Sequence, residues 1–167
     1  FTVIAKAMEA ATGRPYVDLV RERVLEPAGM TRTVPNDRTI EIPDRTGFYL
    51  RAEDGTLGPA PYFDPSHKLA GAGWLATAAD VARLGAALLG SDLLGARVRA
   101  EMFRPVPLAD GTPTEYAPGL RVAERDGRPL LHLPGGGPGI STWIFLHPED
   151  DMAIAVLSNV STGPVGG

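Results

Sequence analysis

Three consecutive glycines, Gly135 to Gly137, are the residues of this sequence best suited to chemistry. They stand in the run LHLPGGGPGIS, residues 131–141, between two stretches with the alternation of β-strands. Because glycine has no side chain, backbone N–H groups in this run stay open to close approach by a ligand. Such groups suit a negatively charged oxygen, so we expect the segment to hold an oxyanion.

The same run also has simpler interpretations. Residues 135–139 could form only a β-turn, and His132 could be an ordinary strand histidine. A phosphate-binding loop is excluded, because neither Lys-Ser nor Lys-Thr follows the glycines and no helix begins there. His67 and His147 have no partner four residues away, so we expect no metal site and no other cofactor.

Composition indicates one globular unit. The chain has 167 residues, of which 44% are hydrophobic and 22% charged, which is enough for one core and too short to argue for two. A net charge of -4 with scattered Lys and Arg argues against nucleic acid or an anionic membrane as a partner, and no run is apolar enough to span a membrane. The absence of cysteine excludes disulfides and thiolate catalysis and fits any redox compartment.

Two helices are predicted before residue 30. Apolar residues from Val3 to Ala11 recur at steps of three and four, and Gly13 and Pro15 then end one helix and begin the next. We interpret both helices as structural. The apolar face predicted for the second helix consists of Val17, Val20 and Val24.

The middle of the chain combines irregular segments with two further helices. Residues 31–68 read as loops with short strands near 47–51 and a turn at Asp54-Gly55; they form either a wall of a binding site or poorly ordered surface. Thr77 and Asp80 cap a helix that ends at Gly90, and residues 94–102 form another. The predicted buried stripe of the capped helix is Val81, Leu84 and Leu88.

The last third of the sequence changes to the period of strands. Residues 119–125 and 129–133 flank Asp126-Gly127, a two-residue hairpin signal, and residues 140–147 and 152–157 form two further strands. Trp143 and Phe145 lie on one face of the 140–147 strand, and other apolar residues lie on the opposite face. We therefore expect an antiparallel sheet with helices on both sides.

Several motifs together resemble the serine β-lactamase and penicillin-binding-protein family, in particular its class C and esterase-like branch. They are the PAGM segment at residues 27–30, the helix start TAAD at 77–80, the glycine run, and VLSN at 156–159. The resemblance covers nearly the whole chain and implies an α+β fold, a β-lactamase/transpeptidase-like antiparallel sheet flanked by helices that is incomplete here. Residues 1–167 would be the C-terminal part of a single β-lactamase-related domain.

The resemblance implies a serine hydrolase acting on amide, ester or D-amino-acid peptide bonds of a small-molecule acyl substrate. The family's S-x-x-K and Y-x-N motifs do not occur in the sequence and are expected upstream of Phe1, so we expect the chain alone to be inactive. The competing interpretation is a non-catalytic binding or scaffolding member of the same fold. The resemblance suggests a periplasmic or secreted location, leaves a cytoplasmic one open and defines no oligomeric state.

The resemblance also implies a missing cover for one sheet face. The family usually places a last helix after the VLSN strand, whereas residues 160–167 are short and Gly-rich. We therefore expect the face with Trp143 and Phe145 to be exposed.

The third family motif, K-T-G or H-x-G, aligns with this sequence in two registers. Alignment on G-x-x-P-G gives Leu133-Pro134-Gly135, and the N–H of Gly136 becomes the oxyanion donor, although leucine cannot donate where Lys or His is usual. A register with one extra residue gives that role to His132, which would need a bulge to reach the same face. Both registers stay open, with a slight preference for the second. The candidate catalytic residues are His132 and Gly136, and the candidate substrate-binding residues are Leu133, Pro134, Gly135 and Gly137.

Overall fold

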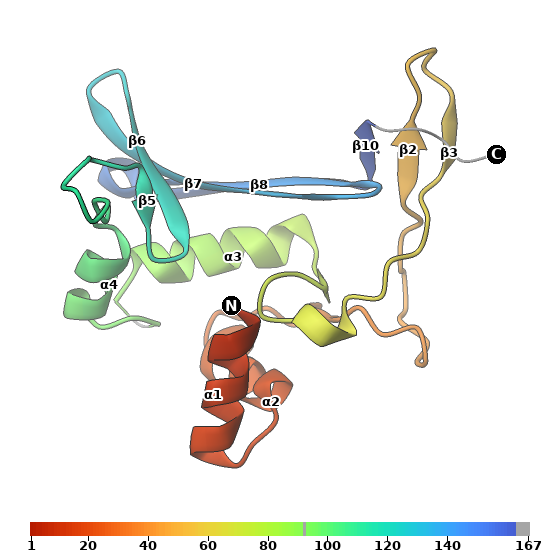
Figure 1. Ribbon diagram of the computed structural model, residues 1–167, viewed down its shortest axis with the longest axis horizontal. Coiled ribbons are helices and arrows are strands. Elements are labelled where there is room, and N and C mark those ends of the chain that lie inside the picture. The colour runs from red at the N-terminus through yellow and green to blue at the C-terminus, as the bar shows by residue number, and fades with distance from the viewer. Residues whose placement is uncertain (92, 163–167) are drawn as a thin grey trace.

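A computed structural model describes residues 1–91 and 93–162 of the chain. Its centre is a five-stranded antiparallel sheet with the order β5-β6-β7-β8-β9. Helix α3 (Ala78–Leu89) lies along one face of this sheet (Figure 1). The fold is α+β, as predicted. The strands are β5 (Tyr116–Ala117), β6 (Leu120–Arg125), β7 (Arg128–Gly137), β8 (Ile140–His147) and β9 (Met152–Ser158).

The two N-terminal helices lie on the far side of α3 from the sheet (Figure 1). Helix α1 (Thr2–Thr12) ends as predicted at Gly13, where φ is +67° and the N–H donates to the carbonyl of Glu9. Helix α2 (Tyr16–Val20) continues as a π-helical segment, η1 (Arg21–Leu25). The predicted valine face is wrong in detail, because the buried side chains are Leu19 and Leu25. Val20 still packs against the core around Leu25, and the wider π-helical turn, which begins at Arg21, places Leu25 rather than Val24 in that core.

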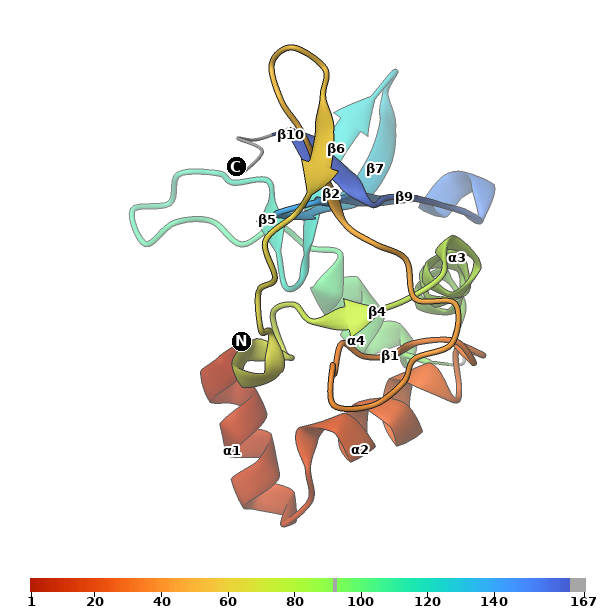
Figure 2. The same ribbon diagram turned by 90° about the vertical axis from the view of Figure 1, so that its right-hand side faces the viewer.

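Residues 31–76 form short strands and loops beside the central sheet (Figure 2). Strand β1 (Val34–Pro35) pairs with β4 (Trp74–Leu75), and a 3-10 turn, η2 (Ser66–Lys68), precedes β4. The hairpin predicted near residues 47–55 is present as β2 (Tyr49–Arg51) and β3 (Leu57–Pro59). Strand β10 (Val160–Thr162), which pairs in parallel with β2, was not predicted, because three residues carry no readable period. The rest of the Gly-rich tail, residues 163–167, lies outside the described residues.

Helix α3 begins and ends at the predicted residues. The hydroxyl oxygen of Thr77 accepts the N–H of Asp80 at 3.1 Å, and Gly90 follows the last turn. Leu88 is buried, and Val81 and Leu84 pack against the same core. The helix predicted at residues 94–102 is present as α4 (Ala96–Met102).

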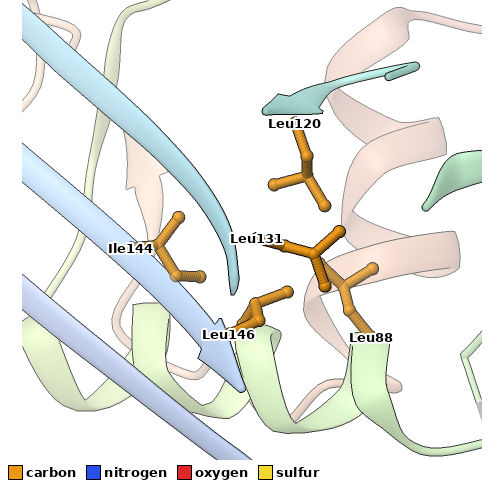
Figure 3. Packing of buried hydrophobic residues seen from close by; sticks show 5 residues of the cluster. All are labelled: Leu88, Leu120, Leu131, Ile144 and Leu146. Carbon is orange, nitrogen blue, oxygen red and sulfur yellow. The ribbon is translucent and has the colours of Figure 1, made fainter. Parts of the chain in front are cut away.

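A glycine in the middle of α3 allows the helix to approach the sheet closely. A Cβ atom on Gly85 would lie 2.7 Å from Cβ of Ala153 and 2.8 Å from Cδ2 of Leu146. Figure 3 shows the core at this contact, where α3 meets the central strands. The buried side chains there are Leu88, Leu120, Leu131, Ile144 and Leu146.

Strand β7 is longer than the strand predicted at residues 129–133. Continuous antiparallel pairing with β8, from Leu131 with Leu146 to Gly137 with Ile140, keeps the three glycines extended as strand residues. The turn at Asp126-Gly127 joins β6 to β7 as predicted. Sequence propensity predicted too short a strand, because glycine is a poor strand former unless pairing with a neighbouring strand, here β8, keeps it extended.

Helices cover only one face of the sheet in the part of the chain that the structure describes (Figure 1). On the opposite face the rings of Trp143 and Phe145 stack with their centroids 5.4 Å apart, and Trp143 and Val156 are 38% and 52% exposed. The prediction of helices on both sides is therefore wrong for these residues. The expected exposure of the face with Trp143 is present.

Candidate active site

The three glycines lie where β7 has a neighbouring strand on one side only. Strand β6 pairs with residues 128–132 of β7, with Arg121 opposite His132 as the last pair, and β5 pairs with the other edge of β6. Residues 133–137 keep β8 as a partner, and no described strand pairs with their other edge. This part of β7 therefore has a free edge.

The register determines which backbone groups point toward that edge. Gly137 and Ile140 flank a two-residue turn and form the first pair of the ladder. Antiparallel alternation then directs the N–H groups of residues 133, 135 and 137 toward β8, and positions 134 and 136 toward the free edge. Pro134 has no N–H. Gly136 therefore carries the only N–H within residues 133–137 that faces the free edge.

The turn at the end of β7 is held in place by contacts with distant parts of the chain. The N–H of Gly139 donates to Oγ of Ser161 at 2.9 Å, and the Ser161 hydroxyl donates to the carbonyl of Gly137 at 3.0 Å. A Cβ atom on Gly139 would lie 2.7 Å from Cβ of Phe48 and 2.8 Å from Cβ of Ala60. The glycine run is therefore a positioned strand with a turn only at its end.

The VLSN segment fixes the loop that faces this turn. The side-chain amide of Asn159 donates to Oγ1 of Thr46 at 3.0 Å and to the carbonyl of Gly47 at 2.9 Å. The carbonyl of Asn159 accepts the N–H of Tyr49 at 2.9 Å. Sequence reasoning used this segment only as a family signature, and the structure gives it a positioning role.

A cavity of about 740 Å³ lies beside the tip of the β7–β8 hairpin. One wall, which we call the backbone wall, contains Gly136, Gly137 and Pro138. The opposite wall, which we call the loop wall, consists of lining residues from the segment 36–76. An open hollow of about 590 Å³ on the other side also contacts Gly136 and Gly137. The edge that carries the free N–H is therefore accessible.

The six sequence candidates divide into two groups. Gly136 and Gly137 line the cavity, whereas His132, Leu133, Pro134 and Gly135 do not. The pairing with β8 is continuous from residue 131 to 137, so no bulge turns His132 toward the cavity. Its ring instead lies on the exposed face, stacked against Trp143 with centroids 5.8 Å apart, and its buried Nδ1 has no hydrogen-bond partner among the described residues. Leu133 pairs with Ile144 on the helix-covered side and is 45% exposed.

Asp80 fixes the segment just before the loop wall to α3. Its buried carboxylate accepts hydrogen bonds from the N–H of Arg32 at 2.8 Å, the hydroxyl of Thr33 at 2.9 Å and the guanidinium of Arg83 at 2.7 Å. Burial alone would raise the pKa of this carboxyl, but the three hydrogen bonds outweigh burial and lower the pKa below its ordinary value. Asp80 is thus an anchor in addition to a helix-start residue.

A metal centre has no ligand set within residues 1–91 and 93–162, where no three His, Cys, Asp or Glu side chains gather closely enough. In the same residues, no helix combines the length and apolar character needed to cross a membrane.

One face of the sheet is covered by α3, and a strand edge formed by glycines lies beside a cavity. This arrangement defines a protein of the β-lactamase and transpeptidase fold class. The sequence matches the family model Beta-lactamase over residues 1–166, and the chain belongs to that family.

Two curated relatives illustrate the range of the family. The chain is 33% identical to serine beta-lactamase-like protein LACTB, mitochondrial, of Bos taurus, covering 96% of this chain and 33% of that protein. It is 25% identical to penicillin-binding protein 4* of Bacillus subtilis (strain 168), covering 95% and 38%. The chain therefore spans about a third of the length of these relatives.

Solved structures share the fold at low sequence identity. The penicillin-binding protein of Bacillus halodurans superposes with a TM-score of 0.79 and 22% identity, over 95% of this chain and 49% of that one. The D-amino acid amidase of Ochrobactrum anthropi SV3, complexed with L-phenylalanine amide, gives a TM-score of 0.79 and 22% identity, over 99% and 49%. Nearly all of this chain aligns with about half of each of these two proteins.

Proposed function

We propose that this chain forms one wall of the acyl-binding cleft of a serine hydrolase that cleaves amide, ester or D-amino-acid peptide bonds. The observation that carries the proposal is the N–H of Gly136, which faces a free strand edge beside the cavity. Hydrolysis of an acyl compound creates a negatively charged oxygen in its tetrahedral intermediate, and one well-placed N–H donor contributes about 3 kcal/mol to that state. On this proposal, residues 1–167 are the C-terminal part of one β-lactamase-related domain.

The proposed reaction needs groups that this sequence does not contain. A serine hydroxyl attacks the acyl carbonyl and passes its proton to a base, and the carbonyl oxygen becomes an oxyanion. Collapse of the intermediate expels the leaving group, which takes up that proton, and water then hydrolyses the acyl-serine ester. Neither S-x-x-K nor Y-x-N occurs in the 167 residues. The nucleophile and base are therefore assigned to residues outside this sequence, and the chain's own part is to hold the oxyanion and the substrate.

The remaining candidates receive different roles. Gly137 lines the cavity beside the donor, and we propose that it contacts the substrate, whereas Leu133, Pro134 and Gly135 lie outside the cavity lining and we propose that they hold the donor in the strand. We assign no catalytic part to His132, because its ring lies against Trp143 on the other face of the sheet.

A second candidate function is binding or scaffolding without catalysis. The observation that favours it is Leu133, a half-exposed aliphatic side chain at the motif position where the family usually has Lys or His. Leucine can neither transfer a proton nor donate a hydrogen bond. Kinetics of variants at Gly136 separate the two functions, because only a hydrolase depends on the oxyanion donor.

The test compares Gly136→Pro with Gly136→Ala in a protein that joins this chain to segments carrying S-x-x-K and Y-x-N. Proline removes the N–H, and because that N–H makes no ladder bond, the pairing with β8 should survive. Alanine keeps the donor and fits, since its Cβ would lie 3.8 Å from the carbonyl oxygen of Ile140. We expect the proline variant to lower kcat by about 100-fold or more and the alanine variant to cost much less.

Melting curves and one further variant provide the controls. Gly135→Pro removes an N–H that bonds β8, so it should lower the melting temperature more than Gly136→Pro does. A folded Gly136→Pro protein with unchanged kcat would reject the oxyanion assignment, whereas an absence of turnover in the unmodified joined protein would favour the non-catalytic function.

A further inference from the structure

The loop wall of the cavity carries positive charge without negative charge. Arg38, Arg45 and Lys68 line the cavity, whereas no Asp or Glu is among its described lining residues. The whole chain has 20 acidic and 16 basic residues, so its composition would favour the opposite sign. The charge of this wall is therefore a local feature of the cavity.

Each of the three cations is positioned by a neutral group. The guanidinium carbon of Arg38 lies 3.9 Å from the ring centroid of Tyr62, and Nζ of Lys68 lies 4.3 Å from that of Phe63. Arg45 donates from Nη2 to Oδ1 of Asn36 at 2.5 Å. Within the described residues, none of the three forms an ion pair with a carboxylate, so their charges are available to a ligand.

Two carboxylates in these loops accept hydrogen bonds from neighbouring turn residues. Asp37 accepts hydrogen bonds from the N–H and the hydroxyl of Thr39, and Asp64 accepts the N–H of Ser66. Both residues belong to the segments that form the loop wall, but neither lines the cavity. They stabilise turns and leave the cavity surface itself cationic.

Aromatic side chains surround the charged groups. The indole N–H of Trp74 donates to the carbonyl of Leu69 at 2.8 Å, which fixes the ring in the cavity wall. A cleft with apolar walls strengthens the attraction between its fixed charges and an oppositely charged ligand. The aromatic residues that line the cavity are Phe48, Tyr49, Tyr62, Phe63 and Trp74.

We propose that this cavity binds a substrate in which a carboxylate stands close to an aromatic group, with the carboxylate directed at Arg38, Arg45 and Lys68. The planar guanidinium of Arg38 can stack on Tyr62 and still offer two N–H groups to a carboxylate. The inference rests on the proposed function in that it names the substrate class of the same cleft. The backbone wall would then hold the reacting carbonyl and the loop wall the charged end of the substrate.

The experiment is calorimetric titration of the purified chain with N-benzoylglycine and with its neutral amide. The two probes have nearly the same shape and differ by one charge. We expect the acid to bind about 10-fold tighter than the amide at low salt and to lose that advantage as salt rises, because screening weakens charge attraction in an open cleft.

Variants locate the binding site. Arg38→Gln and Lys68→Gln should each weaken binding of the acid by about two- to five-fold, and the triple variant with Arg45→Gln should remove the preference for the acid over the amide. Arg125→Gln is the matched control, because it deletes one exposed positive charge outside the cavity lining. It should leave both affinities unchanged.

Three results would overturn the proposal. They are no measurable binding of the acid, equal affinities for the acid and the amide, or an equal loss of affinity in Arg125→Gln and Arg38→Gln. The titration requires neither a nucleophile nor turnover, so none of these results would affect the assignment of Gly136 as the oxyanion donor. Likewise, an unchanged kcat of Gly136→Pro would not affect the proposed preference of the cavity for the acid over the amide.

Discussion

The two walls of the cavity differ in what they offer to a ligand. The backbone wall presents main-chain groups of a glycine strand whose register with β8 is continuous. The loop wall presents cationic and aromatic side chains carried on short strands and loops. A main-chain donor in a paired strand is fixed by the sheet, whereas side chains on loops are free to vary. Under the proposed function, reaction type would depend on the backbone wall and substrate choice on the loop wall.

The largest expected effect is the absence of turnover by the chain alone. The backbone wall can stabilise a negative charge, but only a nucleophile can create it, and S-x-x-K is absent from the sequence. Incubation with a chromogenic cephalosporin and with a p-nitrophenyl ester should give the rates of buffer. If turnover occurs and Ser141→Ala abolishes it, the β7–β8 hairpin carries its own nucleophile, and the comparison of the walls would fail.

The next effect concerns Gly139, where the two walls touch. An added Cβ would lie within 2.8 Å of Phe48, Ala60 and the backbone nitrogen of Tyr49, so Gly139→Ala should destabilise the fold by about 3 kcal/mol. Gly127→Ala is the matched control, since φ is +75° there and +73° at Gly139, but open space surrounds it. It should cost only about 1 kcal/mol, the strain of a positive φ. Equal losses in denaturant unfolding would mean that the walls do not pack together at Gly139.

A smaller effect is expected from Asp80, which joins residues 32 and 33, just before the loop wall, to α3. Asp80→Asn removes the charge and leaves hydrogen-bond donors without a suitable acceptor, so we expect a loss of about 1–3 kcal/mol at neutral pH. The folded-state pKa lies below the unfolded one, so the stabilisation from ionised Asp80 is present above the unfolded pKa. It is lost as pH falls through the folded pKa.

Urea unfolding at a series of pH values measures this dependence. The parent chain should lose the Asp80 contribution below about pH 4, where an ordinary aspartate begins to protonate. The Asn variant, measured beside it, should lack that part of the acid slope. Parallel acid slopes in the two proteins would contradict the assignment of Asp80 as an ionised anchor.

Local sequence signals predicted most of the helices and strands, because caps and alternation act over few residues. Gly13, Thr77 and the Asp126-Gly127 turn mark boundaries that the structure confirms. The extension of β7 through the glycines was missed, because pairing with β8 overrides the low strand propensity of glycine. The buried face of α2 and η1 was missed because periodicity assumes regular α-helix geometry.

The candidate site was only partly predictable. The sequence left two registers open for the third motif, and only the unbroken pairing of residues 131–137 with β8 determines that His132 faces away from the cavity. The cations of the loop wall could not be recognised, because Arg38 and Lys68 are far apart in an irregular segment that the fold brings to one surface. Only Pro134 indicated the free strand edge in the sequence, because a residue without an N–H suits a strand edge that has no partner.

Amide hydrogen exchange, followed by NMR on the isotope-labelled chain, measures whether the N–H of Gly136 is free. We expect Gly136 to exchange at least about 10-fold faster than Gly135 and Leu133, whose N–H groups bond β8. Protection of Gly136 equal to that of Gly135 would show that its N–H is not free, because the donor would then already have an acceptor within the protein.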